Sequence, residues 1–141
     1  MVIMANSYKV FISHSSEDTW VATQIARRIK GDCQAECFLD IYDIAKGDHF
    51  DQRIFDELPS CSELIALLTP WAAERNWVWV EIGAARALQK RVVGVLYGLK
   101  MTDLENERGG MACLNPTNVM SLNDFEAYLS ELKRRVKDGV K

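Results

Sequence analysis

A tryptophan and a glutamate with helical spacing are the residues of this sequence that best suit a small binding site. Trp77-Val78-Trp79-Val80-Glu81 places Trp77 and Glu81 four residues apart, so they share one face of a helix. An indole ring and a carboxylate would then border the same volume. The helix dipole favours an ionised Glu81, whereas burial between aromatic rings favours the neutral acid, and the sequence leaves both open. The alternative is a solvated first-turn acid that stabilises its helix.

Hydroxyl and imidazole groups follow the first predicted strand. Ser13 and His14 stand where side chains and backbone amides at a helix start can bind a phosphate or a ribose, while Ser15 or Ser16 caps the helix. A catalytic serine is not indicated, because no Gly-x-Ser-x-Gly turn occurs and the chain has two histidines.

An aspartate after the second predicted strand suggests a different chemistry. Asp40 could be the phosphoacceptor of a response regulator, since it follows a strand of a doubly wound sheet. That activity needs an acidic pair after the first strand to bind magnesium, and Ser13-His14 stands there instead. Phosphoryl transfer is therefore disfavoured.

Short apolar runs and helical repeats predict the elements that carry these residues. The runs typical of buried parallel strands are Tyr8–Ser13, Glu36–Leu39, Glu63–Leu68, Arg91–Leu96 and a weaker one near Asn118–Met120. The expected helices run from Ser15 or Ser16 to Gly31, from His49 to Leu58 before Pro59, around Val78, Ile82 and Ala85, and from Leu122 to Lys137 with Ser121 as cap and Phe125, Leu129, Leu132 and Val136 inside. Residues 98–116 are expected to be a loop. A five-stranded parallel sheet with helices on both faces follows, with ligands beyond the carboxyl ends of the strands.

Composition limits the possibilities further. With 141 residues, 48% apolar and 26% charged, we expect a tail over 1–7 and a single domain over 8–138. The net charge of -3 argues against nucleic-acid binding, and the apolar runs are too short to cross a membrane. Met1–Ser7 does not read as a secretion signal, so a cytoplasmic location is expected. The spacing of the four cysteines predicts reduced thiols and no metal site.

Four segments, taken together, resemble the Toll/interleukin-1 receptor (TIR) domains, in particular the bacterial ones. Tyr8 to Asp18 looks like the first strand of that family and its loop, and Phe38-Leu39-Asp40 followed by Gly47-Asp48 looks like the second strand and the BB loop. Leu67-Leu68-Thr69-Pro70 is similar to the end of the third strand, with Thr69 in place of the usual serine. Trp77 to Glu81 matches the Trp-xxx-Glu box. The resemblance implies a flavodoxin-like TIR fold.

The resemblance to enzymatic TIR domains implies an NAD+ nucleosidase with Glu81 as the catalytic residue. Trp77, Ser13, His14, Asp40 and Gly47 are then the substrate-binding residues, with NAD+ as substrate and no cofactor or metal. One carboxylate suits this reaction, because nicotinamide leaves as a neutral molecule and needs no general acid. The products would be nicotinamide and either ADP-ribose or a cyclic isomer. Resemblance to the stand-alone TIR enzymes of Thoeris-type anti-phage defence implies a separate effector that the product activates.

The BB loop carries the expected self-association surface. Tyr42 and Ile44 offer apolar contact to a neighbouring TIR domain, and Lys46 and Asp48 are exposed charges. In enzymatic members of the family, such a contact completes the substrate site, so activity depends on assembly. The same loop fits a second hypothesis, a non-catalytic interaction module that acts as a scaffold or interferes with host signalling.

Overall fold

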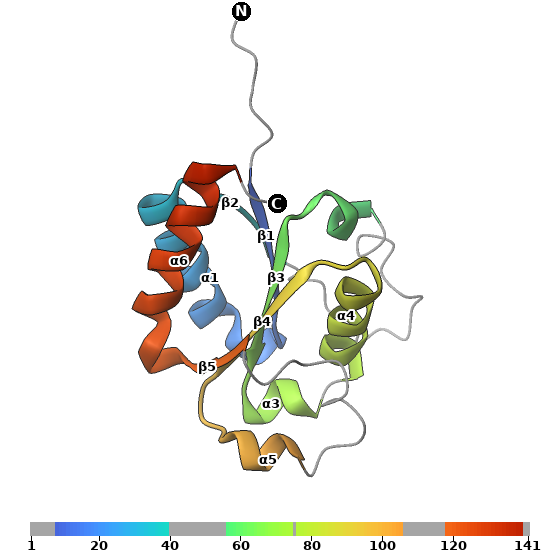
Figure 1. Cartoon of the computed structure of the whole chain (residues 1–141). Coiled ribbons are helices and arrows are strands. Elements are labelled where there is room, and N and C mark those ends of the chain that lie inside the picture. The colour runs from blue at the N-terminus through green and yellow to red at the C-terminus, as the bar shows by residue number, and fades with distance from the viewer. Residues whose placement is uncertain (1–7, 40–55, 75, 106–117, 140–141) are drawn as a thin grey trace, which may run out of the picture.

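The computed structural model describes residues 8–39, 56–74, 76–105 and 118–139, and these form a single parallel sheet between helices. The strands are β1 (Lys9–Ser13), β2 (Glu36–Leu39), β3 (Glu63–Leu68), β4 (Arg91–Leu96) and β5 (Val119–Ser121). Their order is β2-β1-β3-β4-β5, and each neighbouring pair is parallel (Figure 1). Every predicted strand is confirmed to within one residue at each end. The predicted doubly wound α/β class is confirmed as well.

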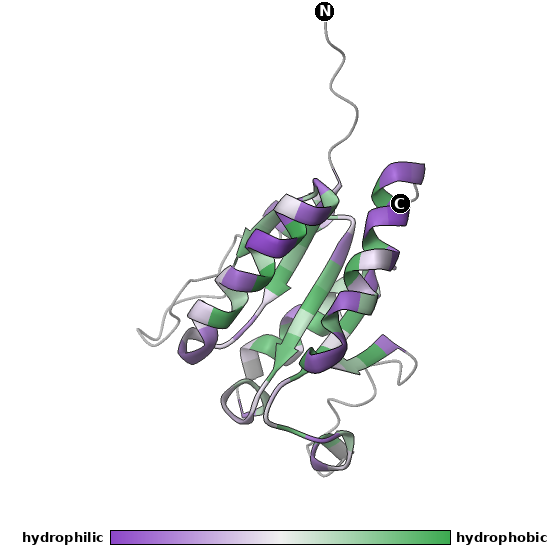
Figure 2. Cartoon of the chain, turned by 90° about the vertical axis from the view of Figure 1, so that its left-hand side faces the viewer, coloured by the Kyte–Doolittle hydropathy of each residue, from purple (hydrophilic) through white to green (hydrophobic). Residues whose placement is uncertain are grey.

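Helices cover both faces of the sheet, as the strand pattern predicts. The helices α1 (Thr19–Arg28) and α6 (Phe125–Asp138) pack on the face that carries Ile65 and Leu67, and Figure 2 shows their hydrophilic sides turned away from the apolar strands. The helix α4 (Asn76–Ala87) packs on the opposite face, against Leu64 and Ala66. Because successive side chains of a strand point to opposite faces, β3 is buried throughout.

The first helix starts where the sequence predicts and ends later. Ser15 caps a 3₁₀ turn, η1 (Ser16–Asp18), by accepting a hydrogen bond from the Glu17 amide, and α1 follows. The predicted stop at Gly31 is wrong. The chain continues through a π-helical turn, η2 (Ile29–Cys33), and ends at Gln34, whose φ is 57°. Burial of both ends of η2 against α6 outweighs the local signal of the glycine.

Three other boundaries differ from the prediction. The expected loop over 98–116 contains a helix, α5 (Met101–Glu105), because Leu104 is buried in the core that α4 covers. The helix expected before Pro59 is described only from residue 56 on, and it passes through the proline as a 3₁₀ turn, η3 (Leu58–Ser60). The last helix begins with a 3₁₀ turn, η6 (Leu122–Asp124), capped by Ser121 as predicted, and α6 ends at Asp138. The turn η3 can contain Pro59 because a proline is tolerated near a helix start, where its missing N–H has no partner.

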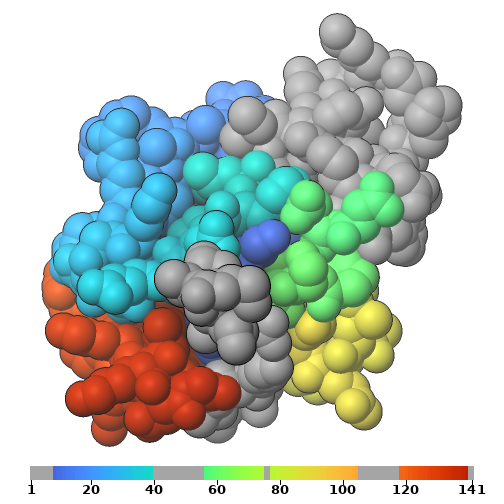
Figure 3. All heavy atoms as spheres, turned by 90° about the horizontal axis from the view of Figure 1, so that it is seen from above, coloured from blue at the N-terminus to red at the C-terminus, as the bar shows by residue number. Residues whose placement is uncertain are grey.

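A buried carboxylate at the start of β3 joins the sheet to α6. Glu63 has no exposed surface and accepts hydrogen bonds from the hydroxyls of Tyr8 and Tyr128, both at 2.5 Å. Arg135 completes the network with its Nε and Nη2 atoms at 3.1 and 3.2 Å. Figure 3 looks onto this amino end of the strands, where α6 lies beside η2. Burial, followed by the hydrogen bond to Glu63, raises the pKa of Tyr8 to about 12.

Candidate functional site

Glu81 lies in the second turn of α4, on the side of the helix that faces the sheet. Val78, Ile82 and Ala85 form the buried stripe of this helix, and Glu81 falls within that stripe at the i+3 position from Val78. The side chain therefore points toward the strands, with no exposed surface. The interpretation of Glu81 as a solvated first-turn acid is wrong.

Ser13 is the residue that meets Glu81. It ends β1, and strand alternation puts its side chain on the same face as Phe11, which packs in the core beneath α4. The Ser13 hydroxyl is fully buried and donates a hydrogen bond to Oε1 of Glu81. A predicted substrate-binding residue and the predicted catalytic residue, 68 positions apart, are thus in direct contact. Their roles in binding and catalysis stay predictions.

The two tryptophans of α4 have different surroundings. Trp77 is half-buried one turn before Glu81, and it packs against the edge of the core that α4 covers. It therefore keeps part of its surface available for a ligand, as a stacking residue needs. Trp79 is structural, because its indole N–H donates to the carbonyl of Ala73 at 3.1 Å and so ties α4 to the short helix α3 (Pro70–Ala73).

The loop after β1 is more buried than the sequence indicates. His14 is inside the protein, with its Nδ1 atom 3.2 Å from the carbonyl oxygen of Ile12. Asp18, which the helix pattern places in a first turn, is 4% exposed, and its Oδ2 accepts a hydrogen bond from the Thr69 hydroxyl at 2.5 Å. Burial raises the pKa of Asp18, and the Thr69 hydrogen bond and the nearby His14 partly offset that effect.

Sequence reasoning missed the Asp18–Thr69 contact, although the signals were present. Both residues follow strands that are neighbours in the sheet, and Ser13 of β1 is in register with Ala66 of β3. The carboxyl ends of adjacent parallel strands meet at one edge, so polar residues just beyond them are brought together. The candidate site therefore consists of Ser13, His14, Asp18, Thr69 and Glu81, with Trp77 at its border.

Several predicted residues cannot be placed against this cluster. Asp40 and Gly47, predicted to bind substrate, and Tyr42, Ile44, Lys46 and Asp48, predicted to mediate self-association, lie outside the described residues. The same holds for the response-regulator hypothesis, which depends on Asp40. Within the described ranges no group of three potential metal ligands occurs, and no helix there is long and apolar enough to span a membrane.

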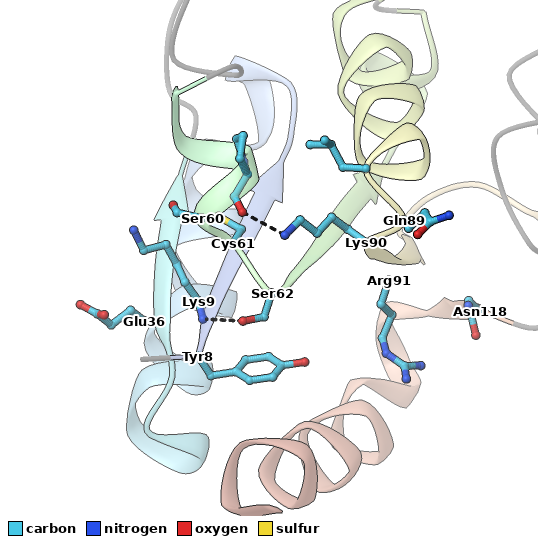
Figure 4. Close-up of a pocket in the computed structure, with 12 residues that line it drawn as sticks. Tyr8, Lys9, Glu36, Ser60, Cys61, Ser62, Gln89, Lys90, Arg91 and Asn118 are labelled. Carbon is cyan, nitrogen blue, oxygen red and sulfur yellow. Dashed lines mark hydrogen bonds between the residues drawn. The ribbon is translucent and has the colours of Figure 1, made fainter. Parts of the chain in front are cut away.

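A cavity of about 880 Å³ opens at the opposite edge of the sheet, where the strands begin (Figure 4). Its lining includes three basic residues, but two of them already have partners. The Lys90 ammonium donates to the carbonyl of Pro59 at 2.9 Å, and that of Lys9 lies 3.6 Å from Glu57. Ligands of open parallel sheets bind at the carboxyl ends of the strands, so we place the candidate site at the Ser13–Glu81 edge and not in this cavity.

The strand order and the helices on both faces define a flavodoxin-like α/β domain, and the polar cluster lies at the carboxyl edge of its sheet. Residues 10–132 match the family model described as TIR domain. The chain therefore belongs to the TIR domain family.

Comparison with known proteins gives relatives of several kinds. The chain is 26% identical over 101 residues to a protein of Brachypodium distachyon named probable 2′ cyclic ADP-D-ribose synthase BdTIR. That match covers 69% of this chain and 44% of the relative, so the chain spans less than half of the relative's length.

Two solved structures share the fold. One is the TIR domain of the Toll-related receptor TRR-2 from Hydra magnipapillata, with a TM-score of 0.64, 16% identity, and coverage of 93% of this chain and 99% of that one. The other is the TIR domains of the activated Roq1 resistosome, which recognises the pathogen effector XopQ, with a TM-score of 0.57, 16% identity, and coverage of 94% and 82%. At this identity they show the fold alone.

Proposed function

We propose that this TIR domain cleaves the bond between nicotinamide and ribose in NAD+, with Glu81 as the catalytic residue. The observation that carries the proposal is the buried hydrogen bond from Ser13 to Glu81 at the carboxyl edge of the sheet, one helical turn from the half-buried Trp77. The similarity to a probable 2′ cyclic ADP-D-ribose synthase supports the same class of substrate.

The proposed reaction uses the carboxylate as an electrostatic partner for a developing cation. The bond from the anomeric carbon to the pyridinium nitrogen breaks, and its electron pair leaves with neutral nicotinamide. Positive charge develops on the ribose, where an ionised Glu81 stabilises it. Water then attacks and loses a proton to give ADP-ribose, or a hydroxyl or nitrogen of the same molecule attacks and loses a proton to give a cyclic isomer. The Ser13 hydroxyl fixes the orientation of the carboxylate, and Trp77 stacks on the nucleotide.

The burial of Glu81 makes this activity dependent on assembly. In the single chain neither Glu81 nor Ser13 has exposed surface, so a substrate cannot touch the carboxylate in this conformation. We propose that self-association through the BB loop opens the site, and that dilute protein is nearly inactive. NAD+, other TIR domains and an effector activated by the product are the proposed partners. Anti-phage defence and a cytoplasmic location rest on the resemblance and the composition alone.

The decisive test measures nicotinamide release from NAD+ by concentrated protein, with and without a crowding agent. Glu81→Gln should abolish release, because it keeps the side-chain volume and removes the charge. Glu131→Gln on the exposed side of α6 is the matched control, and it should release nicotinamide at the wild-type rate. Mass spectrometry of the products separates ADP-ribose from a cyclic ADP-ribose isomer, whose formula has one water less. Release that persists in Glu81→Gln would reject the site assignment and leave the enzyme class intact.

The second candidate function is a non-catalytic interaction module. The complete burial of Glu81 favours it, because in the single chain this carboxylate contacts Ser13 and holds α4 against β1, out of reach of a substrate. This function predicts no nicotinamide release at any protein concentration, together with a loss of stability in Glu81→Gln. Nicotinamide release by the wild-type protein therefore separates the two candidates.

A further inference from the structure

Asp18 is a buried carboxylate at the edge of the candidate site, and the proposed chemistry does not use it. It is the last residue of η1, and its Oδ2 is 2.5 Å from the hydroxyl oxygen of Thr69, which is fully buried. An aspartate just before a helix normally faces water, where it caps or complements the helix dipole. Asp18 makes no side-chain cap of α1. Its carboxylate is turned inward to Thr69 instead.

The Asp18–Thr69 bond joins the chain that leaves β1 to the chain that leaves β3. Ser13 is in register with Ala66, so Thr69 lies three residues beyond the register partner of Ser13. Residues Ser15 to Asp18 also form a closed turn, because the Asp18 amide donates to the Ser15 carbonyl at 2.8 Å. Anchoring Asp18 on the neighbouring strand end therefore fixes the turn that follows directly on Ser13 and His14.

Thr69 connects the same bond to the helix that carries Glu81. Its hydroxyl donates to Asp18 and accepts from the Ala72 amide at 3.1 Å, which starts α3. The last residue of α3, Ala73, in turn accepts the indole N–H of Trp79 in α4. The segment after β1 positions the Ser13 hydroxyl, and the segment from Thr69 through α3 to α4 positions the Glu81 carboxylate. These two segments meet at Thr69.

We propose that Asp18 is a positioning residue for the candidate active site, whose hydrogen bond from Thr69 holds the Ser13 hydroxyl on Glu81. The inference rests on the proposed function. Stability alone does not explain the carboxylate, because burial raises the pKa of Asp18, so its ionised form is less favourable in the folded chain than in the unfolded one. A buried ionisable group kept at a cost in stability is typical of functional sites.

The test compares variants that remove the hydrogen bond with variants that keep it. Asp18→Ala and Thr69→Val remove it, and we expect kcat for nicotinamide release to fall roughly tenfold or more while KM changes less than about twofold. Asp18→Asn keeps an acceptor and Thr69→Ser keeps the hydroxyl, so both should recover most of kcat. The double variant Asp18→Ala/Thr69→Val should be no slower than either single variant, because the two residues act through one bond.

The control is Ser121→Ala, which removes the side-chain cap of η6 at the end of β5, an edge strand that β4 separates from β3. It should lower thermal stability without changing kcat. The proposal is overturned if kcat follows thermal stability across all of these variants, or if Asp18→Asn and Thr69→Ser are as slow as Asp18→Ala. Either result would make the Asp18–Thr69 bond a general stabilising contact.

A second readout separates this inference from the proposed function. If the wild-type protein releases no nicotinamide under any condition, the proposed function fails, and amide hydrogen exchange then tests the positioning role. Asp18→Ala should accelerate exchange about tenfold or more in residues 13–18 and in the first two turns of α4, and Ser121→Ala should not. Unchanged exchange in both segments would refute the positioning role.

Discussion

The hydrogen bond between Ser13 and Glu81 allows a quantitative prediction. Ser13→Ala removes one hydroxyl from a fully buried position and leaves Oε1 of Glu81 without that donor. A hydrogen bond to a charged group contributes about 1.5–3 kcal/mol, and the change from serine to alanine creates little cavity. We therefore expect the free energy of unfolding to fall by about 2 kcal/mol.

The activity should fall by a corresponding amount if the bond orients the carboxylate in the transition state. A loss of about 2 kcal/mol corresponds to roughly a 30-fold decrease in kcat. Urea unfolding followed by circular dichroism gives the first quantity, and nicotinamide release at high protein concentration gives the second. Ser130→Ala is the matched control, because its hydroxyl donates to the Glu126 carbonyl on the exposed side of α6. It should change stability by less than about 0.5 kcal/mol.

A double variant tests whether the effect belongs to this bond. Ser13→Ala combined with Glu81→Met replaces both partners by apolar side chains, which costs much less than leaving one buried polar group without its partner. The double variant should therefore be more stable than the sum of the single effects predicts. Strict additivity, or a Ser13→Ala protein as stable as the Ser130→Ala control, would refute the reasoning.

Two further predictions concern the buried network at the amino end of the sheet. Glu63→Gln removes the charge that pairs with the nearly buried Arg135, and we expect a loss of about 3–5 kcal/mol in urea unfolding; a loss under about 1 kcal/mol would contradict a structural role. Because the pKa of Tyr8 is raised to about 12 in the folded chain, its contribution to stability is complete below its unfolded pKa near 10 and is lost as the pH rises through 12. The free energy of unfolding should thus fall above about pH 10, and less steeply in Tyr8→Phe; equal slopes would contradict the assignment.

The strands could be predicted because their signal is local. Buried parallel strands need apolar side chains on both faces, so runs such as Glu63–Leu68 and Arg91–Leu96 mark them directly. Helix starts at Ser15 and Ser121 were predictable for the same reason, since a cap involves residues two or three positions apart. The end of the first helix was not, because the contact of η2 with α6 decides it.

For the candidate site too, the sequence predicts some features and leaves others to the tertiary structure. Trp77 and Glu81 could be selected from their spacing and from the resemblance to TIR domains, and the carboxyl edge followed from the expectation of a parallel sheet.

The sequence by itself determined which strands form and which polar residues lie beyond the strand ends. The tertiary structure decided what those residues contact: Ser13 with Glu81, and Asp18 with Thr69. These pairs are 68 and 51 positions apart, so no local pattern joins them. The first pair forms only when α4 packs on the end of β1, and the second only when the ends of β1 and β3 meet. Both contacts exclude water, so a buried hydroxyl or carboxylate must find its partner inside the protein.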